Sequence, residues 1–74
     1  MSKPRKTFSG DFVIEILIKK FDFKVVSQKG SHVKLMGEGH VTIVPLHEEL
    51  ARGTMGSVLK MAGIEKKRFL SECE

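Results

Sequence analysis

The first half of the chain changes from one hydrophobic period to another. Between residues 9 and 21 the apolar residues recur with a helical period of about 3.6 residues, whereas polar and apolar residues alternate between residues 23 and 44. Ser9 is expected to cap the helix, and Asp11 in its first turn suits the positive end of the helix dipole. The predicted helix has one broad apolar stripe, formed by Val13, Ile14, Leu17, Ile18 and Phe21.

Phe12 and Ile16 fall outside that stripe, among the charged residues of the same helix. Two apolar side chains one turn apart could form a docking patch on the surface. They could equally lie beneath the segment that precedes the helix, with Phe8 covering them. The sequence leaves both alternatives open.

The alternating region contains three short stretches, FKVVSQ, HVKLM and HVTIV, which glycine-containing turns separate. They predict a three-stranded antiparallel meander. For the second turn we expect Val33 to pair with Ile43 and Leu35 with Val41, which leaves residues 37–39 as a three-residue loop with glycine at both ends.

The first turn has two alternatives. A two-residue loop at residues 29–30 pairs Val26 with Val33, whereas a three-residue loop through Ser31 pairs Val25 with Leu35. Both place Val33 and Leu35 on the side of the core.

Because side chains alternate between the faces of a strand, the other face receives His32 and Lys34. We expect His40 and Thr42 of the third strand to lie beside them. One face of the sheet is then apolar and covered by helices, and the other is polar. The polar face is where a ligand would meet the sheet.

Pro45 is expected to end the third strand, because proline has no amide hydrogen to donate. Thr54 is predicted to cap a second helix over residues 55–62, in which Val58, Leu59 and Met61 supply apolar surface, with Gly63 after its end. A last short helix over residues 65–71 should add Phe69 and Leu70 to the same core. The fold class is α+β, with element order α-β-β-β-α, a terminal helical turn, and helices on one face of the sheet.

The 74 residues have room for one domain, with its core at about residues 9–71 after a short basic segment. The net charge of +4 makes polyanions the first class of partner to consider.

No stretch approaches the roughly 18 apolar residues of a membrane span, and no secretory signal pattern precedes the helix. A cytoplasmic protein without a membrane segment is expected. Cys73 is the single cysteine, which excludes an internal disulfide and a multi-cysteine zinc site.

Two segments, QKGSHVKL at residues 28–35 and VTIVPLHEELARGTMGSVLKMAGI at residues 41–64, together with the preceding helix, resemble the HicA-type toxins of toxin-antitoxin pairs. The resemblance extends from about residue 9 to residue 70. It implies a double-stranded-RNA-binding-like fold and the activity of an mRNA interferase. It also implies that His32 is the catalytic residue, that Gly30 and Ser31 form the turn presenting it, and that a HicB-type antitoxin covers the active face. The very short turn at residues 37–39 departs from the common pattern of the family.

The chemistry of RNA fits this implication. The 2′-hydroxyl of RNA is a nucleophile beside the phosphate, so a protein needs to move protons and to stabilise negative charge on phosphorus. Histidine suits the first task, because its reference pKa allows both proton states near neutrality. Lys29 and Lys34 are the candidates for phosphate contacts, and Lys24 depends on the register.

One histidine cannot be acid and base at the same instant. His40 is expected on the polar face but at the far end of the next strand, about three to four residues at roughly 3.3 Å each from His32. His47 follows the third strand, whose end runs back beside the start of the second, so His47 is the candidate second histidine. Its alternative role is to anchor the loop before the second helix. No metal site and no cofactor are expected, because the three histidines show no close metal-binding spacing.

Two other functional classes compete with a metal-independent endoribonuclease acting on mRNA. A non-catalytic RNA-binding module could recognise duplex RNA by shape and phosphate contacts alone. A protein-binding adaptor could use Phe12 and Ile16, with its charge incidental. Replacement of His32 distinguishes the nuclease from the RNA-binding module, because a nuclease should lose turnover and a binder only part of its affinity.

Overall fold

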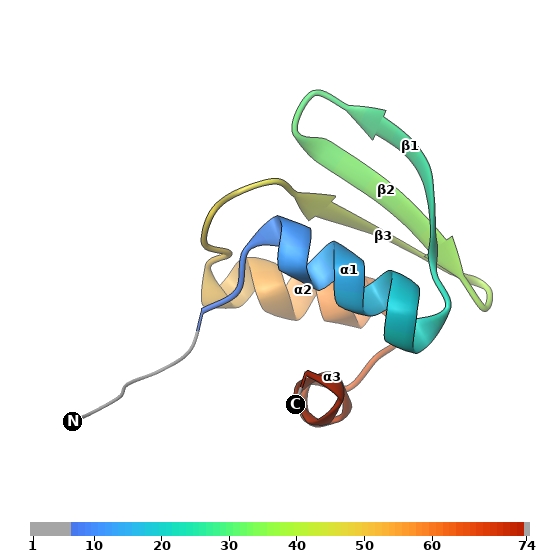
Figure 1. Ribbon diagram of the computed structural model, residues 1–74, viewed down its shortest axis with the longest axis vertical. Helices are drawn as coiled ribbons and strands as arrows, with labels where there is room; N and C mark the ends of the chain where they lie inside the picture. The colour runs from blue at the N-terminus through green and yellow to red at the C-terminus, as the bar shows by residue number, and fades with distance from the viewer. Residues whose placement is uncertain (1–6, 74) are drawn as a thin grey trace.

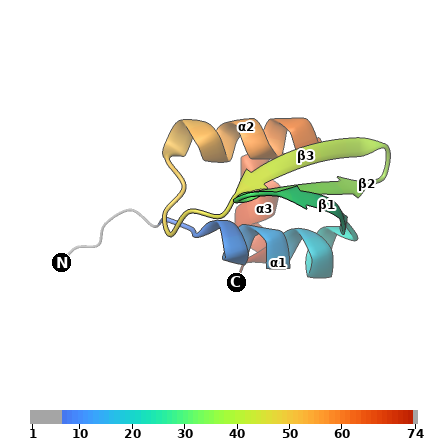
Figure 2. The ribbon, with the colours of Figure 1, turned by 90° about the horizontal axis from the view of Figure 1, so that it is seen from above.

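A computed structural model of the protein describes residues 7–73; the basic segment at residues 1–6 lies outside the described part. The three strands form one antiparallel sheet in the order β1-β2-β3. Figure 1 shows α1 and α2 on the same side of the sheet, with α3 beyond them, and Figure 2 gives the view from above. The predicted α+β class with helices on one face is confirmed. The elements are α1 (Gly10–Phe21), β1 (Lys24–Lys29), β2 (His32–Gly37), β3 (His40–Pro45), α2 (Arg52–Ala62) and α3 (Lys66–Glu72).

Ser9 caps α1 as predicted, because its hydroxyl accepts a hydrogen bond from the Phe12 amide at 3.1 Å. The buried stripe of the helix is narrower than predicted and rotated. Val13 and Leu17 are buried, but Ile16 joins them while Ile18 is 41% exposed. The prediction for Ile18 was therefore wrong.

Phe8 packs against the side of α1 that carries Phe12. Its ring stacks on Phe12 with centroids 5.3 Å apart and meets Phe69 edge-on at 6.1 Å. The Phe8 carbonyl also accepts a hydrogen bond from the Leu50 amide at 2.8 Å. The segment before α1 therefore covers Phe12, as in one of the two alternatives, and Ile16 is only 8% exposed, so the predicted docking patch of Phe12 and Ile16 was wrong.

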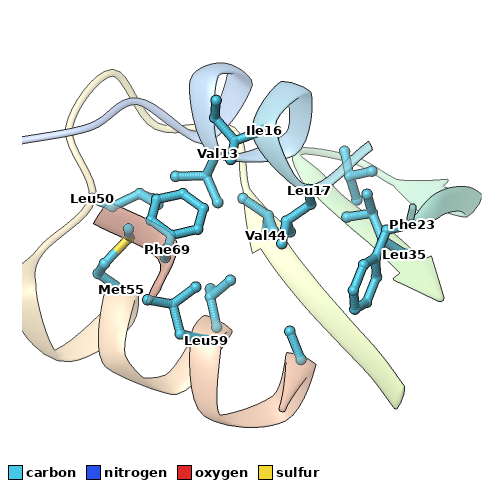
Figure 3. Packing of buried hydrophobic residues seen from close by; sticks show 13 residues of the cluster. Val13, Ile16, Leu17, Phe23, Leu35, Val44, Leu50, Met55, Leu59 and Phe69 are labelled. Carbon is cyan, nitrogen blue, oxygen red and sulfur yellow. The ribbon is translucent and has the colours of Figure 1, made fainter. Parts of the chain in front are cut away.

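Side chains from all three helices and from the sheet meet in one hydrophobic cluster (Figure 3). Phe69 of α3 is fully buried, which confirms its predicted place in the core, and it lies between the residues of α1 and those of α2. Met61 and Leu70, which were also expected in the core, are instead exposed. The largest fully buried hydrophobic side chains are Phe69, Leu17, Leu35, Val13, Val44 and Val58.

The second helix begins earlier than predicted. It starts at Arg52, preceded by Ala51, which makes no side-chain capping bond. Thr54 lies inside the first turn, so its predicted role as N-cap was wrong. Gly63 follows the helix with φ 73°, and its amide donates to the Lys60 carbonyl, so the predicted end is confirmed. The last helix is displaced by one residue from the expected range.

The loop between β1 and β2 contains two residues, Gly30 and Ser31, and Lys29 pairs with His32 across it. Val25 pairs with Leu35, as in one of the two predicted registers, but without its three-residue loop. A β-bulge between Val25 and Ser27 shifts the register by one residue and so allows both the Val25–Leu35 pair and the two-residue loop.

The loop between β2 and β3 contains Glu38 and Gly39, both with positive φ, and Gly37 pairs with His40. Positive φ at both positions is typical of the two-residue type I′ turn, whose twist matches that of the flanking strands. The predicted three-residue loop was wrong, and the register of β3 is displaced by one residue. A displacement of one residue exchanges the two faces of a strand.

As a result Thr42 and Val44 face the helices, and Val41 and Ile43 face outward. Thr42 is fully buried, and its hydroxyl donates a hydrogen bond of 2.7 Å to the Val58 carbonyl of α2. This bond gives the buried hydroxyl a partner and ties β3 to α2.

Candidate functional site

The sheet face that the helices leave open carries one row of side chains from each strand. On β2 the exposed residues are His32, Lys34 and Met36, which alternate with buried neighbours as predicted. Directly paired residues of neighbouring antiparallel strands share a face. The partners are Lys29, Ser27 and Lys24 on β1, and Pro45, Ile43 and Val41 on β3.

His32 is the first residue of β2, and hydrogen bonds on both sides hold the turn before it. The Gln28 side-chain amide donates to the Gly30 carbonyl at 3.0 Å, and the Leu46 amide donates to the Ser31 carbonyl at 2.7 Å. Gly30 has φ 60°, in the left-handed region that favours glycine. The turn thus fixes the backbone from which the exposed imidazole of His32 projects.

Two lysines lie close to this histidine on the same face. Lys29 is the direct cross-strand partner of His32, which places their Cβ atoms about 5 Å apart. Lys34 follows two residues along β2, about 7 Å away. Lys24 also lies on this face, but at the other end, opposite Met36. Both nearer lysines are exposed, so their ammonium groups can reach a ligand beside His32.

The electrostatic character of the open face is positive. None of the three strands contains an aspartate or glutamate, while β1 and β2 together contribute three lysines. Fields of like-signed charges add over short distances and attract polyanions. The face therefore suits a phosphate backbone next to His32.

Only part of the open face is polar, in contrast to the sequence-based prediction. Thr42 is buried on the opposite face, so its predicted place beside Lys34 was wrong, and Ile43 occupies that place. His40 is also on the opposite side. A Cβ at Gly63 would overlap its ring, so the imidazole lies over the end of α2. The exposed apolar row of β3 could have been recognised only by reading EG at residues 38–39 as a two-residue turn.

His47 lies two residues beyond Pro45, the partner of His32. Two backbone hydrogen bonds hold the chain here. The Leu46 amide donates to the Ser31 carbonyl, and the Gly10 amide donates to the His47 carbonyl at 2.9 Å. The expectation that the end of the third strand returns beside the start of the second is confirmed. The bond from Gly10 joins the backbone of His47 to the N-terminus of α1.

The surroundings of the site add no further ligand groups. Within residues 7–73, no group of three or more histidine, cysteine, aspartate or glutamate residues is placed to hold a metal ion. A groove of about 710 Å³ lies between the start of the described chain, α2 and α3, and it includes none of the candidate residues. None of the described helices has the length and hydrophobicity needed to cross a membrane.

Comparison with protein families identifies the class of protein. The model of the HicA toxin of bacterial toxin-antitoxin systems matches residues 13–64. This match covers most of the chain, including the three strands, α2 and all of the candidate residues, so the chain belongs to the HicA toxin family. No curated protein and no solved structure matches the chain significantly.

Family membership makes the chain a toxin of a toxin-antitoxin system and implies an antitoxin partner. The helix α3 lies beyond the matched residues, although its Phe69 completes the core.

Proposed function

We propose that this protein is a metal-independent endoribonuclease that cleaves mRNA, with His32 as its general acid or base. The observation that carries the proposal is the position of His32: an exposed imidazole on a hydrogen-bonded turn, opposite Lys29 on an open face without carboxylates. Members of the HicA family are generally mRNA interferases, which supports the same reaction class.

In the proposed reaction the 2′-hydroxyl of the RNA attacks the adjacent phosphorus, and the bond from phosphorus to the 5′-oxygen breaks. His32 takes the proton of the 2′-hydroxyl or gives a proton to the leaving 5′-oxygen. Lys29 and Lys34 stabilise the negative charge that develops on the phosphoryl oxygens. Gly30 and Ser31 hold the turn and contact the RNA backbone. The products are a 2′,3′-cyclic phosphate and a 5′-hydroxyl.

A second proton-transfer group completes the reaction, and His47 is the candidate within this chain. It follows the strand end that is bonded to Ser31, and its side chain is exposed. If water fills the second role instead, replacement of His47 leaves most of the rate intact. The two schemes differ in the number of histidines on which the rate depends.

The antitoxin of this pair is proposed to be of the HicB type and to cover the face that carries His32. The described chain has an accessible surface of 5104 Å². A partner that buries an ordinary interface of about 800 Å² on this chain would occupy much of one face. Inhibition then follows from burial alone, without a change in the toxin's structure. A complex in which His32 stays open to solvent would contradict this mode of inhibition.

The reaction class is tested by incubating the purified protein with a labelled mixed-structure RNA in EDTA and identifying the ends of the products. We expect cleavage, with 2′,3′-cyclic phosphate and 5′-hydroxyl ends. An otherwise identical strand with 2′-deoxyribose at the cleaved position is the matched control and should remain intact. Binding of the RNA without any cleavage would favour the non-catalytic RNA-binding module.

A further inference from the structure

The open face of the sheet carries an apolar strip next to the candidate site. It consists of Met36, Val41 and Ile43, which are 47%, 38% and 41% exposed. Met36 and Val41 are direct cross-strand partners, and Ile43 is the partner of Lys34. The strip therefore begins at Met36, in the same β2 row as His32 and Lys34, and extends onto β3.

The requirements of the fold do not account for this strip. The opposite face of β2 and β3 supplies the core, through Val33, Leu35 and Val44. Valine and isoleucine suit strands even when they are exposed, but methionine has no such preference. Phosphate groups also gain nothing from aliphatic surface. A contiguous exposed apolar area beside a functional site is typical of a protein interface.

The charges around the strip define the chemistry of its partner. The strip is bordered by Lys34 and by Lys24, the β1 partner of Met36, and the three strands contain no acidic residue. A complementary surface has apolar side chains at its centre and carboxylates at its edge on the lysine side. Such a surface belongs to a folded protein and is compatible with an antitoxin, which also has to exclude RNA from the same lysines.

We propose that this strip is the anchor of the antitoxin: an apolar segment of the antitoxin, flanked by acidic residues, docks on Met36, Val41 and Ile43. The proposal rests on the proposed function in that the antitoxin blocks the face on which RNA is cleaved. It assigns different residues to the two ligands. The antitoxin derives most of its affinity from the apolar strip of β2 and β3, whereas the RNA depends on the lysines of β1 and β2.

The test uses the double variant Val41→Thr with Ile43→Thr, which keeps β-branched side chains on the strand but removes apolar surface. Val25→Thr is the matched control, because Val25 is 49% exposed on β1 and pairs with Leu35, on the other face. Binding of the purified cognate antitoxin is measured by calorimetry, with all variants in a His32→Ala background. Circular dichroism checks that each variant is folded.

We expect the double variant to bind the antitoxin on the order of 30-fold more weakly and the control to bind within about twofold of the parent. With His32 restored, the double variant should cleave RNA within about threefold of the parent rate and require correspondingly more antitoxin for inhibition. Because the binding measurement uses an inactive background, it remains decisive even if no form of the protein cleaves RNA.

Two results would overturn the proposal. Unchanged affinity of the double variant for the antitoxin would show that the strip is not the anchor. An equal loss of RNA binding and antitoxin binding would show that the strip belongs to the RNA site and that the two ligands are not separated on this face.

Discussion

Gly10 lies directly against the carbonyl of Pro45, the residue of β3 that pairs with His32 of β2. A Cβ at Gly10 would overlap the Pro45 carbonyl oxygen. The Gly10 amide also donates to the His47 carbonyl at 2.9 Å. The first residue of α1 is thus packed against the strand end that supports the candidate site, and glycine is required there by the close approach of two backbones.

We predict that Gly10→Ala lowers the free energy of unfolding by about 2 kcal/mol, because the added methyl group forces α1 away from the end of β3. Chemical denaturation of the two proteins measures the difference. Gly56→Ala is the matched control: this glycine lies inside α2 with nothing near its Cβ position, so the same substitution should stabilise the protein by up to about 1 kcal/mol. Equal effects at both positions would show that the contact with Pro45 is unimportant.

Much of the fold followed from hydrophobic periodicity. The period of 3.6 identified α1, and the alternation through β2 placed Val33 and Leu35 inside and His32 outside, which the structure confirms. Periodicity within β2 determines the faces of that strand whatever its partners do. For this reason His32 and Lys34 could be located on one face from the sequence, whereas the place of Lys29 opposite His32 follows only from the pairing of β1 with β2.

The register of β3 could not be obtained in the same way. The predicted and the observed turns around Glu38 differ by one residue, and the observed turn has a positive φ at a glutamate and is accompanied by the buried bond from Thr42 to Val58. Tertiary interactions of this kind produce no periodic pattern in the sequence. The error placed Thr42 on the wrong face and Ile43 in the core, so the apolar strip beside the candidate site was missed.

The buried hydroxyl of Thr42 provides a second test of the packing. Thr42→Val keeps the shape of the side chain but removes the donor to the Val58 carbonyl of α2. We expect a loss of about 1 kcal/mol in the free energy of unfolding, the usual net value of such a bond. The carbonyl belongs to the interior of α2, so the helix itself should persist. A variant as stable as the parent would mean that the bond contributes nothing net.

Substitution of Phe69 tests whether α3 is part of the core, although this helix lies outside the residues that match the family. We predict that Phe69→Ala lowers the free energy of unfolding by about 3–5 kcal/mol, enough to unfold a marginally stable domain of this size. Leu70→Ala, at a neighbouring exposed position of the same helix, should change stability by less than about 1 kcal/mol. Thermal denaturation distinguishes the two, and similar midpoints would contradict the role of Phe69.

The lysines of the open face give a prediction on binding. Lys29→Gln and Lys34→Gln should each weaken RNA binding at low salt and reduce the slope of log affinity against log salt by about 0.7, as expected when one phosphate contact to a single strand is lost. Lys19→Gln is the control, because Lys19 lies on α1 and pairs with Glu15 at 2.9 Å. Fluorescence anisotropy over a salt series measures these slopes. A slope that falls equally in the control would assign the effect to net charge.

The most direct test of the account is the single-turnover rate of RNA cleavage in EDTA, measured at saturating protein for the parent, His32→Ala and His47→Ala. We predict that His32→Ala still binds RNA within a few-fold of the parent but cleaves it at least about 100-fold more slowly. The size of the His47→Ala effect then decides between one histidine and two. Cleavage by His32→Ala at the parent rate would contradict the assignment of His32 as the catalytic residue.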